Sequence, residues 1–374
     1  MKKFLFGILL PLLLLTGCWD QHLIKDARLV YAAALDRTEN GHVRGTVIIR
    51  GFVASGAESG GGSPQNEIVS GVGKNMRETR MNIDKKLSDS FTGAKTRVYL
   101  YSEVIGEEGL YPYLDIFYRE PSSSLNGKIA ITNGEAAKYL EIIRKGNTLV
   151  AEYIEELIIS SEKNSILPRL DVQAILSKFM DPGSDPVLPY LVLHEEVPEI
   201  EVKGLALFND DRMTGFINTN DATLLLTLMN KTNKFLRFSR KVHVDKRQDI
   251  ENYITIDVYK SKSDMTLNNV SNHSFTVDFD VNLKANIIEY PSDNLGSKKE
   301  FKKLEGKLST MLTKEMNQMI RQLQDANSDP LGIGRELMAF HPKVWKNLEW
   351  EKDYPNIPIN AKVTVEITGN GILN

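Results

Sequence analysis

Residues 275–287 alternate strictly between apolar and polar side chains. Because successive side chains of a β-strand point to opposite faces, this pattern predicts one long strand that is buried on one face only. Such a strand is typical of an antiparallel sheet whose other face lies in water. The inward set is Phe275, Val277, Phe279, Val281, Leu283, Ala285 and Ile287, and the outward set is Thr276, Asp278, Asp280, Asn282 and Lys284.

A long amphipathic helix is expected after this strand, at 298–325. Its apolar residues recur at helical spacing and form one stripe, which consists of Phe301, Leu304, Leu308, Leu312, Met316, Met319 and Leu323. Met311, Met316 and Met319 lie on or beside the stripe, and we interpret them as core residues rather than as a groove for a partner. Further strands are predicted at 253–259 and in the final segment "INAKVTVEITGNG".

The first half of the chain predicts shorter elements. Asn40-Gly41 indicates a hairpin between strands at 28–36 and 43–50, since both residues tolerate positive φ. A polar Gly/Ser segment at 54–67 is interpreted as a connecting loop, with a binding loop as the alternative. The other expected elements are helices at 74–91, 135–145, 148–160 and 171–180, a helix in the second half of 109–120, and strands at 97–106 and 127–134.

The proline-bearing segment 181–189 interrupts helical structure, and we place the main domain boundary near 197. Beyond it we expect two strands joined by a turn at Asn209-Asp210-Asp211, and then a helix capped by Asn220. Runs of strands with helices between them, and few clean βαβ units, indicate an α+β fold with mixed or antiparallel sheets flanked by helices. The expected units are 1–17, 18–197 and 198–374, the last with an optional division into 198–238 and 239–374.

The amino terminus indicates a secreted chain. A positive head, Met1-Lys2-Lys3, precedes the apolar run "FLFGILLPLLLL" at 4–15. As a helix this run would reach about 18 Å, well short of a bilayer core of about 30 Å. The pattern is therefore that of a signal peptide, removed in the mature protein, rather than of a transmembrane helix.

The four residues Leu15-Thr16-Gly17-Cys18, which begin with the last residue of this run, contain the only cysteine of the chain. They resemble the lipobox of bacterial lipoproteins, in which the peptide is cut before the cysteine. This implies cleavage between Gly17 and Cys18, an S-diacylglycerol group on the Cys18 thiol and an N-palmitoyl chain on its amino group. Several acyl chains anchor a protein firmly, at about 0.8 kcal/mol per buried CH₂. A stray cysteine behind an ordinary signal peptide is the alternative.

Charge and motifs narrow the function further. A net charge of −3 gives no basic field that would attract nucleic acid. The sequence has no H-E-x-x-H, C-x-x-C or G-x-S-x-G motif. The segment "GVGKNM" at 71–76 departs from the phosphate-loop pattern, and we interpret it as a turn before a helix. We expect no catalytic set, no metal site and no cofactor.

Scattered polar residues do not change that expectation. Asp278, Asp280 and Asn282 share one strand face, which lacks the curved ligand cage of a calcium site, so we interpret them as a solvated surface. Asp210-Asp211 is interpreted as a turn on the same grounds. No two histidines have the spacing of metal ligands. The six are His22, His42, His194, His243, His273 and His341.

The segment "GCWD" followed by "LIKDARLVYAAALD" resembles the mature start of the Ger(x)C family, the lipoprotein C subunits of spore germinant receptors. The likeness runs through "GKNMRETRMNIDKKLS", "RVYLYSEVIGEEGLYPYLDIFYRE", "ITNGEAAKYL" and "VKGLALFNDDRMTGFINTNDATLLLTLMNK", and covers about 19–372. Its most specific part is the end, from "DPLGIGRELMAFHPKVW" onward, where the residues of the family pattern are Asp329, Gly332, Gly334, Pro342, Trp345 and Trp350. The segment "YREPSSS" at 118–124 departs from that pattern.

The resemblance implies an elongated α+β body of several domains and a non-enzymatic part in a receptor for small nutrients. The implied partners are the membrane, a multi-spanning A subunit with a soluble portion, and a transporter-like B subunit. The implied location is the outer face of the cytoplasmic membrane, which is the inner membrane of the spore. Only Cys18 and the cut after Gly17 carry over as site residues. Trp19 and Asp20 match the family too, either as a tether or as a contact.

Two other classes of function stay open at this point. A lipoprotein that binds a solute and hands it to a transporter would have a deep cleft between two lobes, with aromatic and polar lining. A surface hydrolase would need a nucleophile beside a base, brought together from distant parts of the chain.

The lipobox predicts the outcome of one substitution. Cys18→Ala removes the thiol that accepts the diacylglyceryl group, so the variant should leave the detergent phase in a phase-partition assay while the body still folds. A variant that stays in the detergent phase like the wild type would contradict the lipobox.

Overall fold

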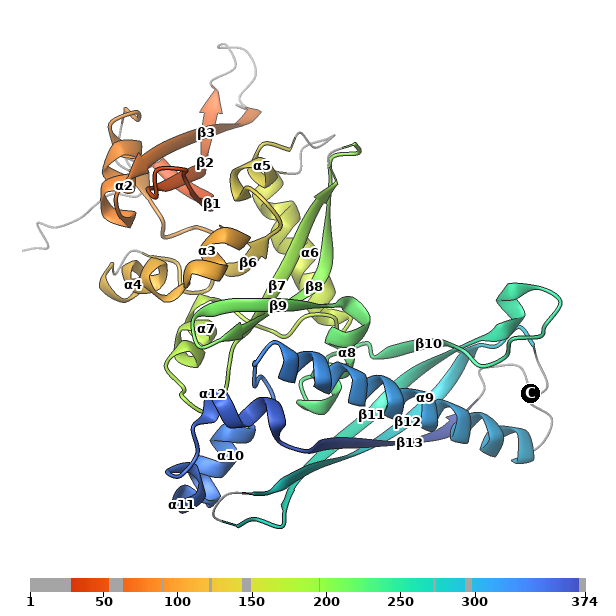
Figure 1. Ribbon diagram of the computed structural model, residues 1–374. Coiled ribbons are helices and arrows are strands. Elements are labelled where there is room, and N and C mark those ends of the chain that lie inside the picture. The colour runs from red at the N-terminus through yellow and green to blue at the C-terminus, as the bar shows by residue number, and fades with distance from the viewer. Residues whose placement is uncertain are drawn as a thin grey trace, which may run out of the picture.

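A computed structural model describes residues 28–53, 63–88, 91–120, 123–142, 149–194, 196–271, 274–292 and 298–369. These residues form two sheets, one of nine strands and one of four, with helices against both. Figure 1 shows the two sheets at opposite ends of an elongated body. The predicted α+β class is confirmed.

The first sheet has the strand order β3-β2-β1-β5-β6-β7-β8-β9, with β4 paired to β1. Its strands are β1 (Arg28–Arg37), β2 (Val43–Val53), β3 (Ser63–Gly73), β4 (Phe91–Thr92), β5 (Val98–Ser102), β6 (Lys128–Thr132), β7 (Val187–His194), β8 (Glu199–Asn209) and β9 (Arg212–Asn218). Its helices are α2 (Met76–Asp84), α3 (Glu103–Glu108), α4 (Tyr111–Arg119), α5 (Ala136–Leu140), α6 (Val150–Lys163) and α7 (Val172–Phe179).

The predicted hairpin at Asn40-Gly41 is confirmed, with Gly41 at φ +73 between β1 and β2. Two neighbouring predictions are wrong in part. The Gly/Ser loop expected over 54–67 ends earlier, because residues from Ser63 onward pair with β2 as β3. The helix expected over 74–91 stops at Asp84, and Phe91 pairs with β1 in β4 instead. In both places sheet pairing outweighs local composition.

The centre of the first sheet is parallel, which corrects the expectation of few βαβ units. β5 pairs in parallel with both β1 and β6, and β6 pairs in parallel with β7. The strand predicted at 97–106 is only the short β5, and α3 begins directly after Ser102. The chain then crosses over through α3 and α4 to reach β6, as a parallel connection requires.

Helices cover both faces of this central region. Val98 and Leu100 of β5 belong to the core that α5 and α6 cover. Tyr99 and Tyr101, on the opposite face of the same strand, belong to the core that includes residues of α3, α4 and α7. α7 begins as predicted, since the Asp171 side chain accepts the Ala174 N–H at 2.8 Å.

Residue 197, where the sequence predicts the main boundary, lies between β7 and β8. β8 pairs with β7 and β9 pairs with β8, so the first sheet continues to Asn218. α8 (Thr219–Leu228) follows and lies between the two sheets (Figure 1). Its N-cap is Asn218, which accepts two backbone N–H bonds, and not Asn220 as predicted.

The second sheet has the order β10-β11-β12-β13. β11 and β12 pair antiparallel, as the alternation at 275–287 predicts, while β12 and β13 pair in parallel. The strands are β10 (Arg237–Lys241), β11 (Tyr253–Asn268), β12 (Thr276–Glu289) and β13 (Ile359–Gly369), and the helices are η2 (Asp249–Asn252), α9 (Lys298–Asp325), α10 (Ile333–Phe340), α11 (Pro342–Trp345), α12 (Trp350–Asp353) and η3 (Tyr354–Asn356).

α9 spans the predicted 298–325, and its apolar stripe is buried apart from Phe301, which is partly buried. Leu308, Leu312, Met316 and Met319 are each 0% exposed, which confirms that Met316 and Met319 belong to the core. Met311 is partly buried and packs against that core. The helix lies along β13, the edge strand of this sheet (Figure 1). A second stripe of the helix, next to the apolar one, faces that edge.

This second stripe is polar and covers the free N–H groups of β13. Four side chains spaced four residues apart on α9 each accept one backbone N–H at 2.9 Å: Asn317 from Ala361, Thr313 from Val363, Ser309 from Val365 and Glu305 from Ile367. The spacings match, because four helical residues rise about 6 Å and two strand residues about 6.6 Å. The edge is therefore closed to pairing with another chain.

The four hydrogen bonds between α9 and β13 predict the effect of removing one acceptor. Thr313→Val keeps the side-chain shape but leaves the Val363 N–H without a partner, which should lower the free energy of unfolding by about 1–3 kcal/mol. The matched control is Thr310→Val, whose hydroxyl donates only to Gly306 of its own helix and should change stability by less than about 0.5 kcal/mol. Urea titrations of both variants measure the two free energies of unfolding. Equal values would contradict a stabilising role for the hydrogen bonds between α9 and β13.

Candidate functional site

The predicted lipidation site lies outside the described residues. Cys18, Gly17, Trp19 and Asp20 all precede Arg28, where the described part of the chain begins. The modification and the cleavage therefore stay predictions. Over the described ranges, no helix has the length and apolar character needed to cross a membrane.

The histidines in the described part of the chain form no shared site. His194 Nε2 lies 2.8 Å from a Glu201 carboxylate oxygen, and His243 Nε2 lies 2.7 Å from the Tyr290 hydroxyl. His22 and His273 fall outside the described residues. Within the ranges that the structure covers, no group of three or more His, Cys, Asp or Glu side chains is arranged to hold a metal ion.

The polar face of β12 is tied up in hydrogen bonds across the strands. Asp278 accepts one from Asn268 at 2.7 Å and one from Asn360 at 3.3 Å. Asp280 and Asn282 on the same face are exposed. This arrangement agrees with the solvated surface that the sequence predicts.

The glycines of "GVGKNM" have a packing role rather than a turn role. Gly71 and Gly73 lie inside β3, which corrects the predicted turn. A Cβ at Gly73 would lie 2.3 Å from the Thr79 backbone nitrogen, so only glycine lets α2 approach the strand this closely. Asn75 then caps α2 by accepting the Glu78 N–H at 2.9 Å.

Two carboxylates, the buried Asp329 and the partly buried Asp185, join the first sheet to the C-terminal helices. Asp185, just before β7, accepts the N–H of Asp329 at 2.6 Å and that of Asp210 at 2.9 Å. Asp329, 1% exposed, accepts three N–H groups at the start of α10: Gly332 at 2.9 Å, Ile333 at 3.1 Å and Gly334 at 2.9 Å. The backbone thus supplies the donors that buried carboxylates require.

Burial sets the charge state of this junction. It raises the pKa of Asp329 to about 7, although the three N–H donors oppose the shift. Burial also raises the pKa of Asp185 and lowers the pKa of the neighbouring Lys178 ammonium group. The Asp329 carboxyl can therefore gain or lose a proton close to neutral pH, which exposed aspartates do not.

Aromatic residues close the other side of the junction. The rings of Trp345 and Trp350 lie 5.3 Å apart, and a Cβ on Gly334 would lie 3.0 Å from both. The Tyr354 hydroxyl donates to the Ser328 carbonyl at 2.7 Å. Most residues of the C-terminal motif found in the sequence meet here, but its spacing alone did not predict this role.

A cavity of about 290 Å³ opens beside the junction. It lies between the first sheet and the C-terminal helices, because residues 178–186 and 209–210 form one wall and residues 327 and 345–351 the other. Its lining combines Lys178 and Asp181 with Trp345 and Trp350. Asp181 is paired with Arg335 at 3.2 Å.

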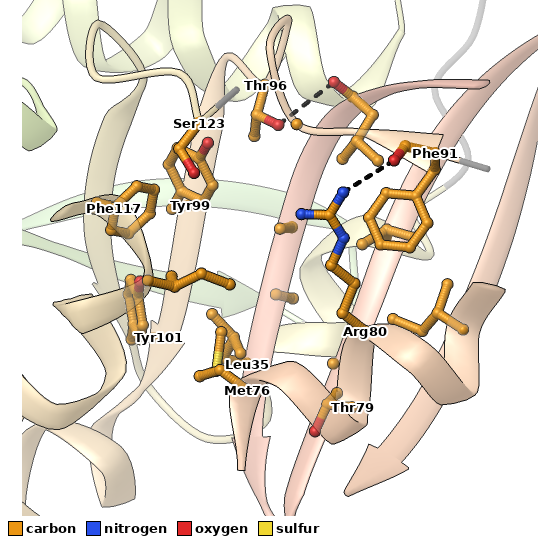
Figure 2. A pocket seen from close by; sticks show the side chains of 18 residues that line it. Leu35, Met76, Thr79, Arg80, Phe91, Thr96, Tyr99, Tyr101, Phe117 and Ser123 are labelled. Carbon is orange, nitrogen blue, oxygen red and sulfur yellow. Dashed lines mark hydrogen bonds between the residues drawn. The ribbon is translucent and has the colours of Figure 1, made fainter. Parts of the chain in front are cut away.

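A second cavity, of about 100 Å³, lies within the first sheet's own layers and is almost entirely apolar. Figure 2 shows Tyr99, Tyr101 and Phe117 on one side of it and Arg80 and Phe91 on the other. Sequence reasoning did not predict it, since its walls come from β1, β2, β4, β5, α2 and α4.

Comparison with known proteins identifies the family. One family model, described as the spore germination protein N-terminal domain, matches residues 20–193, and a second, described as spore germination B3/GerAC like, C-terminal, matches residues 203–371. This chain belongs to the Ger(x)C family of spore germination proteins. The two matches lie on either side of residue 197, although the division there stays a prediction.

Similar Ger(x)C proteins align over almost their whole length. Spore germination protein GerQC of Bacillus cereus is 27% identical over 374 residues, covering 100% of this chain and 99% of its own. Spore germination protein KC of Bacillus subtilis (strain 168) is 21% identical, covering 98% of this chain and 95% of its own. The crystal structure of the GerBC protein matches with a TM-score of 0.59 at 15% identity, covering 90% of this chain and 96% of that chain, and shows the same fold.

The Asp329 carboxyl predicts a pH dependence of stability. Its pKa in the folded Ger(x)C chain, about 7, lies above the ordinary 3.8, so the folded state binds more protons between these values and loses stability as the pH rises through 7. From pH 5 to pH 8, ionisation of this carboxyl should lower the free energy of unfolding by about 2–3 kcal/mol.

Asp329→Asn cannot titrate and should flatten that slope by the same amount, as measured by urea unfolding across the pH range. Asp264→Asn, at an exposed side chain, is the control and should keep the wild-type slope. An unchanged slope in Asp329→Asn would show that the junction does not titrate there.

Proposed function

We propose that this chain is a lipid-anchored, non-enzymatic C subunit of a nutrient germinant receptor. It would work with integral-membrane A and B subunits at the outer face of the cytoplasmic membrane, in the spore inner membrane. The observation that carries the proposal is the match of both family domains, in order, across residues 20–193 and 203–371. The alignment with GerQC supports it, since it covers 100% of this chain and 99% of that protein.

The anchor rests on the sequence Leu15-Thr16-Gly17-Cys18. The described body starts at Arg28, ten residues after Cys18, and ten extended residues reach at most about 35 Å. A lipid on Cys18 would therefore hold the start of β1 within that distance of the membrane surface. At that distance the body could meet the exposed parts of membrane-embedded partners.

The non-enzymatic part of the proposal rests on the family and on the site geometry. His194 and His243, the described histidines with side-chain partners, line neither of the two cavities described above. The carboxylates at the junction, Asp185 and Asp329, accept backbone N–H groups and thereby hold α10 in place. Their geometry fits a structural role.

A lipoprotein that binds a solute and passes it to a transporter is the second candidate. The 290 Å³ cavity between the first sheet and the C-terminal helices has the aromatic and polar lining that this reading requires. The cavity is also in the expected place, between two parts of the body. The family match nevertheless favours the receptor subunit.

The test is an affinity pull-down of the tagged chain from detergent-solubilised spore membranes, followed by mass spectrometry. Recovery of a multi-spanning A-type subunit and a transporter-like B-type subunit is the expected result. Cys18→Ala, expressed at the same level, is the matched control and should recover less of both. Recovery of neither subunit from membranes where the chain is abundant would instead support the solute-binding candidate.

A further inference from the structure

The apolar cavity of Figure 2 lies between two separate hydrophobic clusters of the first sheet. One cluster contains Tyr101 of β5 and Phe117 of α4, and the other contains Val47 of β2 and Ile83 of α2. Ala33 of β1 packs against both. Its methyl group is too small to fill the space where the two clusters meet, and the cavity results.

The size of the cavity matches a small organic molecule. Its volume is about 100 Å³, whereas an engineered apolar cavity of about 150 Å³ takes up benzene. The walls include the rings of Phe91, Tyr99 and Phe117. A ligand of about five or six heavy atoms would gain the contacts that an empty apolar space lacks.

The only charged side chain in the lining already has partners. Arg80 donates to the Phe91 carbonyl at 3.1 Å, and its guanidinium lies 3.4 Å from the Glu120 carboxylate and 5.0 Å from the Phe91 ring. Glu120, which also lies 3.0 Å from Arg77, thus gives the Arg80 guanidinium a carboxylate partner. Because these contacts hold Arg80 and the lining is almost entirely apolar, the cavity suits a neutral ligand.

Among the polar side chains of the lining, Tyr101 has a buried hydroxyl without a hydrogen-bond partner among the described residues. A buried hydroxyl without a partner costs about 1–3 kcal/mol. By contrast, the buried Tyr139 hydroxyl, away from the cavity, lies 3.0 Å from the carbonyls of both Asn133 and Leu191, and either one can accept its proton. The Tyr101 donor is thus available to a ligand at the wall of the cavity.

We propose that this cavity is a binding site for a small neutral molecule with an apolar body and one oxygen acceptor, which the Tyr101 hydroxyl recognises. The small side chain of Ala33 leaves the space, and the aromatic walls contact the apolar body of the ligand. Arg80 already has protein partners, so the ligand can be uncharged. The proposal concerns this chain alone and does not depend on its place in a receptor.

The test uses two volatile probes of one ring size, cyclopentane and cyclopentanone, which differ in the oxygen acceptor. The full chain, with labelled methyl groups, is placed in lipid nanodiscs and equilibrated with each probe through the vapour phase. The vapour pressure sets the thermodynamic activity of the probe, so uptake of probe by the lipid does not change it. Saturable NMR shifts of the Met76, Ile83 and Ile116 methyls are expected for both probes. Absence of these shifts would overturn the proposal.

Three variants separate the parts of the site. Tyr101→Phe should weaken cyclopentanone about fivefold, the worth of one hydrogen bond, and leave cyclopentane unchanged. Tyr139→Phe, the matched control, should leave both affinities unchanged. Ala33→Leu should fill the space and abolish both. Equal cyclopentanone affinity in the wild type and Tyr101→Phe would show that the hydroxyl does not recognise the ligand.

Discussion

The body of this Ger(x)C protein depends on one helix, α8, that is buried on every side. Leu224, Leu225, Leu226 and Leu228 are each at most 3% exposed, although they point in different directions around the helix. A helix that is apolar all round belongs inside a protein, and each buried leucine contributes about 2 kcal/mol. Because α8 lies between the two sheets, their cores merge into one cluster that extends from Ala32 to Ile367.

Around that shared core, buried polar groups determine how the parts meet. Asp185 and Asp329 satisfy backbone N–H groups of both the first sheet and the C-terminal helices. The polar stripe of α9 satisfies the edge of β13 in the same way. Since a buried N–H without a partner is costly, these side chains allow few other arrangements. Burial at this junction also raises the pKa of Asp329 to about 7.

Long, regular patterns predicted structure better than short apolar runs did. The stripe of α9 and the alternation of β12 each repeat over many residues, so local periodicity and tertiary burial agree. β5 and α3 share a short apolar run, where a strand and a helix cannot be told apart by pattern. Of the candidate sites, only Cys18 could be predicted, because a lipobox is a continuous segment. The small cavity could not, since Ala33, Met76 and Tyr101 come from three different elements.

The sequence alone determined that an apolar leader precedes a single cysteine, that the body is α+β, and that the family is that of spore germination proteins. These properties depend on neighbours in the chain or on continuous motifs. The tertiary structure decided that β8 and β9 extend the first sheet, that burial raises the pKa of Asp329, and that a cavity remains beside Ala33. Each of these depends on burial by residues distant in sequence, and burial is a property that only the packed chain has.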